Sequence, residues 1–204
     1  MEITISEDQQ DVLRELMNIA LGEATSNIAQ LLNAFGTMHI PQISTSSTKY
    51  LRSIISQDLD PNLKYYVTKQ LFSGEFGGEI IFTVDEASSK NLSNTVFQTE
   101  NSSSSEIDDA VMELTNIVTS TIVSRLATEL NTTVQFFAPS TSIKAPEDIV
   151  DYSDIDNYTN IVILRTCIEF QEQNISGLIF ILTKNGATLR LVELIDKKLE
   201  ELFS

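Results

Sequence analysis

The stretch Asp11-Val-Leu-Arg-Glu15-Leu-Met-Asn18 recurs later in the chain as Asp109-Ala-Val-Met-Glu113-Leu-Thr-Asn116. In each copy a glutamate follows the aspartate by four positions and an asparagine follows it by seven. At about 3.6 residues per turn, these three positions lie on one face of a helix. We therefore predict two long helices, each displaying two acids and an amide along the same face.

The same face continues through small residues in both copies. These are Gly22 and Ser26 in the first copy, and Ser120 and Ser124 in the second. The opposite side of each predicted helix is apolar, with Leu13, Met17, Ala20, Ala24, Ile28 and Leu31 in the first and Leu114, Val118, Ile122 and Leu126 in the second. An amphipathic helix usually covers its outer face with long charged side chains. An outer face this short and flat is predicted to dock a partner.

A proline extends the repeat beyond the helices. Pro41 and Pro139 each follow the motif asparagine after a gap of twenty-two residues, and the two copies of the whole pattern are 98 residues apart. Ile81-Phe82 and Ile179-Phe180 share that offset. Such self-similarity indicates a duplicated unit. We predict a single domain over residues 1–204, built of two repeats at about 6–98 and 104–203.

The hydrophobic pattern and the turn signals predict similar elements in both halves. In the first half we expect a helix from Ser6 to about Phe35 ended by Gly36, extended chain at Pro41–Thr48, strands at Tyr50–Ile55, Leu63–Phe72 and Glu79–Val84, and a helix at Ala87–Val96. After a serine-rich connector at Asn101–Ser105, the second half is expected to hold a helix capped by Ser105 and running to about Leu130, strands at Thr132–Phe137, Thr159–Phe170 and Ile175–Thr183, and a helix at Gly186–Phe203. This order predicts an α+β fold with pseudo-two-fold symmetry, in which one largely antiparallel sheet carries the two motif helices.

Composition excludes several classes of partner. The formal charge of -16 over 204 residues argues against nucleic acid and anionic membranes, which require cationic patches. Cys167 is the single cysteine, which fits a reducing compartment. The acidic N-terminus does not resemble a signal peptide, and no apolar run approaches the ~20 residues that span a bilayer. We expect a soluble, cytoplasmic protein.

Few enzyme classes fit the residues present. His39 is the single histidine and is expected to lie in a strand, so no Ser-His-Asp or Cys-His machinery is predicted. There is no P-loop, no GxGxxG and no cluster with the spacing of a metal site. The acidic stretch Pro146–Asn157 lacks the spacing and the closing glutamate of a calcium loop, so we expect it to be solvated. An acid and an amide, presented twice, remain as the candidate chemistry.

The pattern acid/Ser-x3-Glu-x2-Asn-x22-Pro resembles the signature of the CheC/FliY/CheX phosphatases of bacterial and archaeal chemotaxis. Its positions are filled by Asp11, Glu15, Asn18 and Pro41, and again by Asp109, Glu113, Asn116 and Pro139. The resemblance covers nearly the whole chain, because two copies on about 200 residues are similar to CheC. FliY-type proteins carry an additional switch domain, and CheX-type proteins keep one site.

The resemblance implies that the substrate is the phosphorylated response regulator CheY, which brings its own Mg²⁺, so that this chain needs no cofactor. Asn18 and Asn116 would then orient the attacking water, and Glu15 and Glu113 would dock to the active-site lysine of the regulator. The alternative is a non-enzymatic adaptor of chemotaxis or of the flagellar switch that binds CheY-phosphate. CheC proteins also bind the receptor deamidase CheD, which makes CheD a second candidate partner. A monomer is the simplest expectation, because the halves already pair within one chain.

Overall fold

The computed structural model describes residues 5–150, 161–183 and 185–203. Its helices are α1 (Glu7–Leu32), α2 (Leu51–Ser56), α3 (Glu86–Phe97), α4 (Ser104–Glu129) and α6 (Asn185–Phe203), with 3₁₀ turns at Thr48–Tyr50 and Pro146–Asp148. Its strands are β1 (Thr37–Met38), β2 (Gln42–Ser46), β3 (Tyr65–Gly74), β4 (Gly78–Asp85), β5 (Val134–Phe136), β6 (Ser140–Lys144), β7 (Ile161–Phe170) and β8 (Ile175–Thr183).

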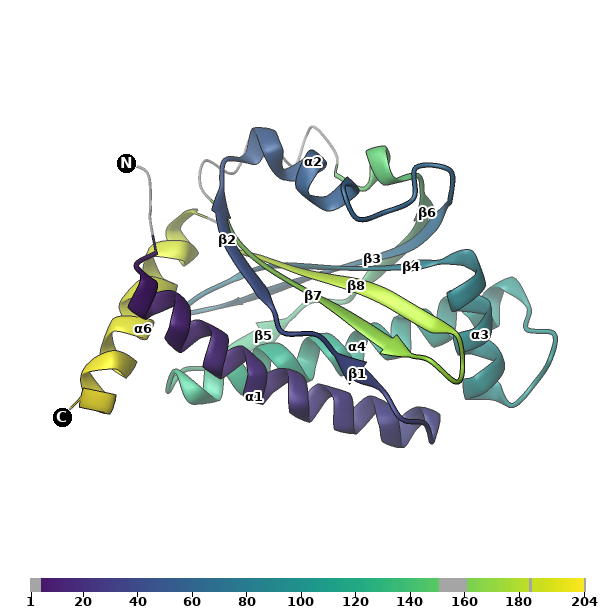
Figure 1. Ribbon diagram of the computed structural model, residues 1–204, viewed down its shortest axis with the longest axis horizontal. Helices are drawn as coiled ribbons and strands as arrows, with labels where there is room; N and C mark the ends of the chain where they lie inside the picture. Colours follow the sequence, from purple (N-terminus) through teal and green to yellow (C-terminus); the bar gives the residue numbers. More distant parts are fainter. Residues whose placement is uncertain (1–4, 151–160, 184, 204) are drawn as a thin grey trace.

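All the described strands join one antiparallel sheet, shown edge-on in Figure 1. Its order is β1-β7-β8-β4-β3-β5, with β2 also on β7 and β6 also on β3. The central pair, β4 and β8, is symmetric: Gly78 lies opposite Thr183 at one end, and Val84 lies opposite Gly177 at the other. A pseudo-two-fold axis therefore passes between β4 and β8, and the predicted α+β fold is confirmed.

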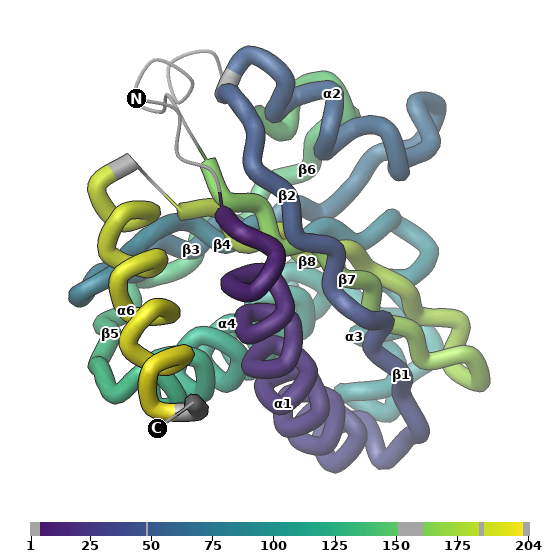
Figure 2. The backbone as a smooth tube through the Cα atoms, turned by 60° about the vertical axis from the view of Figure 1, so that its left-hand side comes forward, coloured from purple at the N-terminus to yellow at the C-terminus, as the bar shows by residue number. Residues whose placement is uncertain are grey.

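Helices lie on both faces of the sheet (Figure 1), and a cluster of buried side chains lies on each face. The helices α1 and α4 pack on one face over the larger core, with α3 beside α4 and α6 beside α1, as Figure 2 shows from another side. The short helix α2 covers part of the other face over a smaller core that includes Leu51, Ile55 and Phe180. Most apolar positions predicted for the motif helices are buried in the larger core, and Leu31 is partly buried against it.

Both motif helices begin with a capping box. Ser6 caps α1 with Gln9 at the third helical position, as predicted. The cap of α4 is Ser103, so the prediction of Ser105 was wrong. The reason is Glu106, which lies three residues after Ser103 and accepts from its backbone N–H at 2.7 Å. Among four consecutive serines, the position of the glutamate selects the cap.

The first helix ends earlier than the sequence predicts. Asn33 adopts a left-handed conformation with φ 45°, and its N–H bonds to carbonyls of the last turn. This ends α1 at Leu32 and leaves Phe35, which was assigned to the helix, 93% exposed. Gly36 is needed for a different reason, since an added Cβ would lie 2.3 Å from the Phe170 ring. Asparagine tolerates the left-handed region better than most residues, which explains the earlier stop.

The predicted strand at Tyr50–Ile55 is wrong, because the segment forms a 3₁₀ turn followed by α2. Its tyrosine and two isoleucines favour a strand by composition. However, Leu51, Ile55 and Leu59 recur every four residues, and all three are buried in the smaller core. That helical period outweighs the composition. The other predicted strands and helices are present within a few residues of their expected limits.

Each signature proline lies in a bulge on an edge strand. Residues 39–41, between β1 and β2, lie opposite only two residues of β7, 166 and 167. Residues 137–139, between β5 and β6, lie opposite 70 and 71 of β3 in the same way. One extra residue on one strand defines a β-bulge, and proline fits there because it has no N–H to donate. The shared spacing from asparagine to proline thus fixes the same bulge in both halves.

Some predictions fall outside the described residues or stay untested. Most of the predicted acidic loop, residues 151–157, is not described, whereas Pro146–Asp148 forms a 3₁₀ turn. The exact boundaries of the two repeats stay predictions. No helix in the described part of the chain is long and apolar enough to cross a membrane.

Candidate functional site

The helices α1 and α4 display the motif residues on their outer faces. Asp11, Glu15 and Asn18 are all exposed on α1. On α4 the two acids, Asp109 and Glu113, are exposed, whereas Asn116 is half-buried. The four small residues that continue the two faces are also exposed: Gly22, Ser26, Ser120 and Ser124. Exposed helix faces of this kind suit a macromolecular partner better than a small molecule, which is normally enclosed in a cleft.

The two helices run antiparallel, so the motifs lie at opposite ends of the pair. Where the helices cross, the Asn27 amide donates to the Thr121 hydroxyl at 3.1 Å. The symmetry-related pair of positions, Glu23 and Arg125, forms an ion pair at 3.6 Å. From this register, Asn18 and Asn116 are separated along the helix axes by about fourteen residues, which is about 20 Å at 1.5 Å per residue. The two motif copies therefore lie too far apart to act together on one phosphoryl group, and they are two separate candidate sites.

The second site is supported from beneath by a buried glutamine. Gln70 on β3 donates from its amide nitrogen to the Phe137 carbonyl at 3.0 Å and toward Asn116 Oδ1 at 3.5 Å. Its own amide oxygen accepts from the Thr119 hydroxyl, one turn after Asn116. Gln70 and Thr119 are buried, so the network lies in a region of low dielectric, where such bonds are strong. The network restrains the Asn116 side chain.

The first site lacks this support. Thr166 occupies the place on β7 that Gln70 occupies on β3, and its hydroxyl donates to the His39 carbonyl at 2.7 Å. The shorter threonine donates to the bulge carbonyl as Gln70 does, but its side chain does not reach the motif helix α1. Within the described residues, the side chain of Asn18 has no hydrogen-bond partner, and Asp11 pairs with Arg14 at 2.6 Å. The two sites therefore share a signature but differ in preorganisation.

The bulges explain why the proline belongs to the signature. At each bulge, the carbonyl two residues before the proline accepts a hydrogen bond from a side chain of the neighbouring strand. The His39 carbonyl accepts from Thr166, and the Phe137 carbonyl accepts from Gln70. In the second half that same side chain contacts Asn116. The sequence showed the Asn-to-Pro spacing but gave no sign of Gln70, which lies forty-six residues before Asn116.

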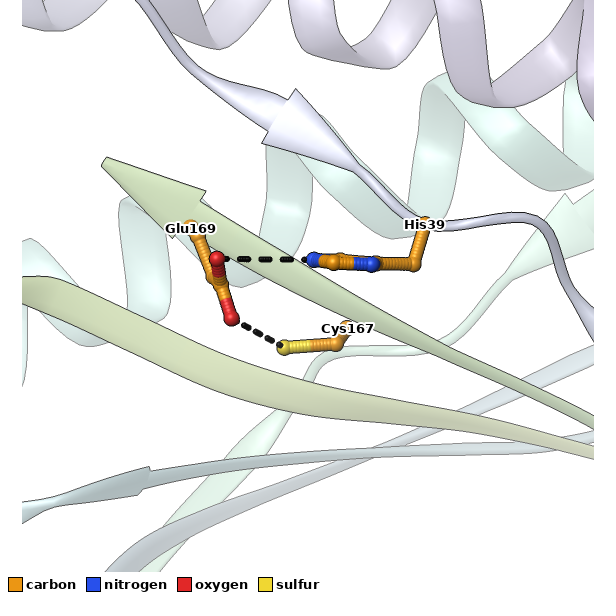
Figure 3. Close-up of side chains that lie close together, drawn as sticks. All are labelled: His39, Cys167 and Glu169. Carbon is orange, nitrogen blue, oxygen red and sulfur yellow. Dashed lines mark hydrogen bonds and ion pairs between the residues drawn. The ribbon is translucent and has the colours of Figure 1, made fainter. Parts of the chain in front are cut away.

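A second group of side chains comes together on the opposite face of the sheet. His39, Cys167 and Glu169 offer a ring nitrogen, a sulfur and carboxylate oxygens that all lie within 4.8 Å of one another. Figure 3 shows one oxygen of the Glu169 carboxylate facing the imidazole and the other facing the thiol. Sequence spacing could not reveal this group, because His39 is 128 residues from Cys167. Burial and the Glu169 carboxylate raise the pKa of the Cys167 thiol to about 11, so the free thiol is a poor nucleophile at neutral pH.

Gly22 provides a test of the first helix face. An added Cβ at Gly22 would have no heavy atom within 4 Å, whereas glycine inside a helix costs about 0.5–1 kcal/mol relative to alanine. We expect Gly22→Ala to raise the free energy of unfolding by about that amount in urea titrations. Gly36→Ala is the matched control and should lower it, because its Cβ would meet the Phe170 ring. An unchanged or lower stability of Gly22→Ala would contradict this reading of the helix face.

Comparison with protein families identifies one match. The family described as "Chemotaxis phosphatase CheX" matches residues 66–158. The matched range contains the second motif copy, from Asp109 to Pro139, and Gln70, whereas the first copy lies outside it. No curated protein has a sequence similar enough to match the chain.

Solved structures of the same fold cover almost the whole chain. FliY from Thermotoga maritima is 15% identical with a TM-score of 0.74, covering 96% of this chain and 100% of that one. The FliM middle domain from H. pylori is 10% identical with a TM-score of 0.59, covering 93% and 99%. CheX from Desulfovibrio desulfuricans is 11% identical with a TM-score of 0.57, covering 83% and 99%. Together with the family match, these similarities confirm the resemblance that the two motif copies predicted.

Proposed function

We propose that this protein, which resembles the CheC/FliY/CheX chemotaxis phosphatases, hydrolyses the aspartyl phosphate of the response regulator CheY. One observation carries the proposal: the Glu/Asn pair is presented outward twice, on α1 and on α4, of a fold shared with that family. The match to a chemotaxis phosphatase over residues 66–158 supports the activity. The substrate and the residue roles are parts of the proposal.

The chemistry explains how so sparse a site can work. An aspartyl phosphate on CheY already has a Mg²⁺ ion and a lysine that stabilise the charge of the transferring group. The missing component is a water held in line with phosphorus. An asparagine both donates and accepts hydrogen bonds, so Asn18 or Asn116 can orient this water without ionising. Orientation worth about 3 kcal/mol accelerates hydrolysis roughly a hundredfold.

The glutamates have a docking role in this mechanism. Glu15 and Glu113 each lie about one helical turn before the motif asparagine, on the same exposed face. A carboxylate there can pair with the active-site lysine of the regulator and fix the position of the phosphoryl group over the asparagine. The exposed small residues Gly22 and Ser120 leave room for close approach. No cofactor of this chain takes part, because the proposed metal ion belongs to the substrate.

The decisive experiment follows the decay of radiolabelled CheY-phosphate with Mg²⁺, with and without this protein. We expect the intact protein to accelerate decay, and the double variant Asn18→Ala/Asn116→Ala to return it to the spontaneous rate. Asn27→Ala is the control, because it removes an exposed asparagine of α1 outside the signature and should keep the acceleration. Since it also removes the bond to Thr121, its thermal unfolding is compared with that of the intact protein. Equal acceleration by the double variant and the intact protein would refute the proposed roles.

The alternative function is binding without hydrolysis. The FliM middle domain shares the fold, which shows that the fold is not confined to proteins named as phosphatases. Unchanged CheY-phosphate decay together with retained binding to CheY-phosphate would make this chain an adaptor. Binding to CheD would be compatible with either outcome and needs a separate pull-down with purified CheD. Sedimentation of the isolated chain would test the expected monomer.

A further inference from the structure

We propose that His39, Cys167 and Glu169 form a zinc-binding site on the face of the sheet opposite α1 and α4. Cys167 and Glu169 lie on β7, whereas His39 lies in the bulge between β1 and β2, so the prediction that it is a strand residue was wrong. The three side chains lie close together (Figure 3). The site does not depend on the phosphatase proposal, because it shares no residue with the motif helices. Zinc is inferred from the donor set, which combines a nitrogen, a sulfur and an oxygen.

Two of the donor distances are close to those of tetrahedral coordination. Zinc ligands at about 2.0–2.3 Å from the metal lie about 3.3–3.8 Å from each other in a tetrahedron. His39 Nε2 is 3.4 Å from Glu169 Oε2, and Cys167 Sγ is 3.7 Å from Glu169 Oε1. These two contacts end on different oxygens of the carboxylate, and one donor atom from each of the three residues lies within 4.8 Å of the other two. Rotation of these exposed or half-buried side chains is therefore needed to bring all three donors to the spacing that the metal requires.

The sheet fixes the positions of these side chains. His39 lies directly opposite Cys167, to whose carbonyl its N–H donates at 3.0 Å. Glu169 is the next residue of β7 on the same face, since alternate residues of a strand share a face. In the bulge, the His39 carbonyl accepts a hydrogen bond from the Thr166 hydroxyl, which fixes the backbone at His39. A site built on paired strands and a fixed bulge needs little reorganisation to bind a metal ion.

The other half of the molecule shows that the fold does not demand these residues. There the N–H of Phe137 donates to the Leu71 carbonyl at 3.0 Å, which makes Phe137 and Leu71 the counterparts of His39 and Cys167. Both counterparts are exposed apolar side chains, and Ser73 takes the place of Glu169. At the same place in the same bulge, one half thus carries two hydrocarbon side chains and a hydroxyl, whereas the other carries three metal ligands.

A fourth coordination position is open to solvent. Cys167 and Glu169 also line a pocket of about 200 Å³, so water has access to the proposed metal position. The pocket includes Asp85 and also Asp58, whose charge is offset by its ion pair with Arg165 at 2.6 Å. On binding, the thiol of Cys167 releases its proton to solvent and the thiolate bonds to the metal. Three protein ligands and a water match the pattern of open zinc sites.

Cobalt substitution tests the proposal with a readout specific to sulfur. The full-length protein, kept reduced, is titrated with Co²⁺ alone, and the thiolate-to-cobalt charge-transfer absorption is recorded. We expect the intact protein to develop this band to one equivalent and added Zn²⁺ to abolish it. Cys167→Ser should show no band, and His39→Ala should weaken cobalt binding at least tenfold.

The protein is strongly acidic, so adventitious binding to surface carboxylates needs its own control. Glu169→Gln and Glu172→Gln remove the same charge from the same hairpin, and only Glu169 belongs to the cluster. Glu169→Gln should weaken cobalt binding, whereas Glu172→Gln should leave it unchanged. Zn²⁺ should raise the Tm of the intact protein but not that of Cys167→Ser, and equal concentrations of Mg²⁺ should raise neither selectively. A missing charge-transfer band, or an equal zinc response in all variants, would overturn the proposal.

Discussion

Asn116→Ala should lower the acceleration of CheY-phosphate decay about tenfold, whereas Asn18→Ala should lower it less than about threefold. The difference follows from the support beneath the two asparagines. Asn116 is half-buried and held by Gln70, but Asn18 is exposed and has no hydrogen-bond partner within the described residues. A restrained amide has already lost the rotational freedom that a mobile one must lose when it binds the attacking water. Single-turnover rates at saturating enzyme give the comparison directly.

Gln70 can be tested as the positioning residue behind this difference. In the Asn18→Ala background, where only the second site remains, Gln70→Leu should lower the rate at saturation by about tenfold with a smaller change in apparent affinity. Thr166→Val removes the counterpart in the other half, and in the same background it should leave the rate unchanged. Thermal unfolding of each variant separates misplacement from loss of fold. Equal activities of Asn18→Ala and Asn116→Ala would contradict the inferred asymmetry of the sites.

Phe82→Ala should lower the free energy of unfolding by about 3–5 kcal/mol, the usual cost of removing a fully buried phenylalanine. Phe82 lies on β4 at the centre of the sheet, opposite Ile179 of β8, and is 1% exposed. It belongs to the larger core beneath α1 and α4, so the cavity would lie where the halves meet. Urea denaturation measures the loss. A cost below about 1 kcal/mol would show that this place is not the packed centre described above.

Gly177 offers a check on the same contact. An added Cβ at Gly177 would lie 2.6 Å from the Phe82 ring and 2.9 Å from the Thr83 carbonyl oxygen. Gly177→Ala should therefore destabilise the protein by about 1–3 kcal/mol through overpacking. Combined with Phe82→Ala, it should cost less than the sum of the two single changes, because the ring it meets is gone. Additive effects would indicate that the ring is not the obstacle.

The sequence predicted the helices and the duplication well because both rest on long, repeated patterns. The acid, glutamate and asparagine recur at i, i+4 and i+7, and the apolar positions of each helix face the larger core. Local chemistry was harder to predict. Several consecutive serines offered equivalent caps until Glu106 decided between them, and Asn33 ended a helix before the more obvious Gly36.

What the sequence could not reveal depends on pairing between distant strands. Equivalent positions of the two halves are 98 residues apart in the motif helices and at the prolines. In the central strands the equivalent positions, such as Gly78 and Gly177, are one residue further apart. The β3–β4 and β7–β8 hairpins differ in length, so a single offset cannot relate both the helices and the strands of the two halves. Gln70 and the group of His39, Cys167 and Glu169 depend on strand register in the same way. Register is set by the whole sheet, so no local spacing encodes it.

The pairing of β4 with β8 at the centre of the sheet also affects how the protein is made. During translation β4, which ends at Asp85, is synthesised ninety residues before β8 begins at Ile175. At about 5–20 residues per second, this interval lasts several seconds or more. During it the β3–β4 hairpin can form, but its inner edge, with Ile80 and Phe82, has no partner strand. The nascent chain therefore presents an open, apolar strand edge, which is the surface that chaperones protect and that neighbouring chains on a polysome can join.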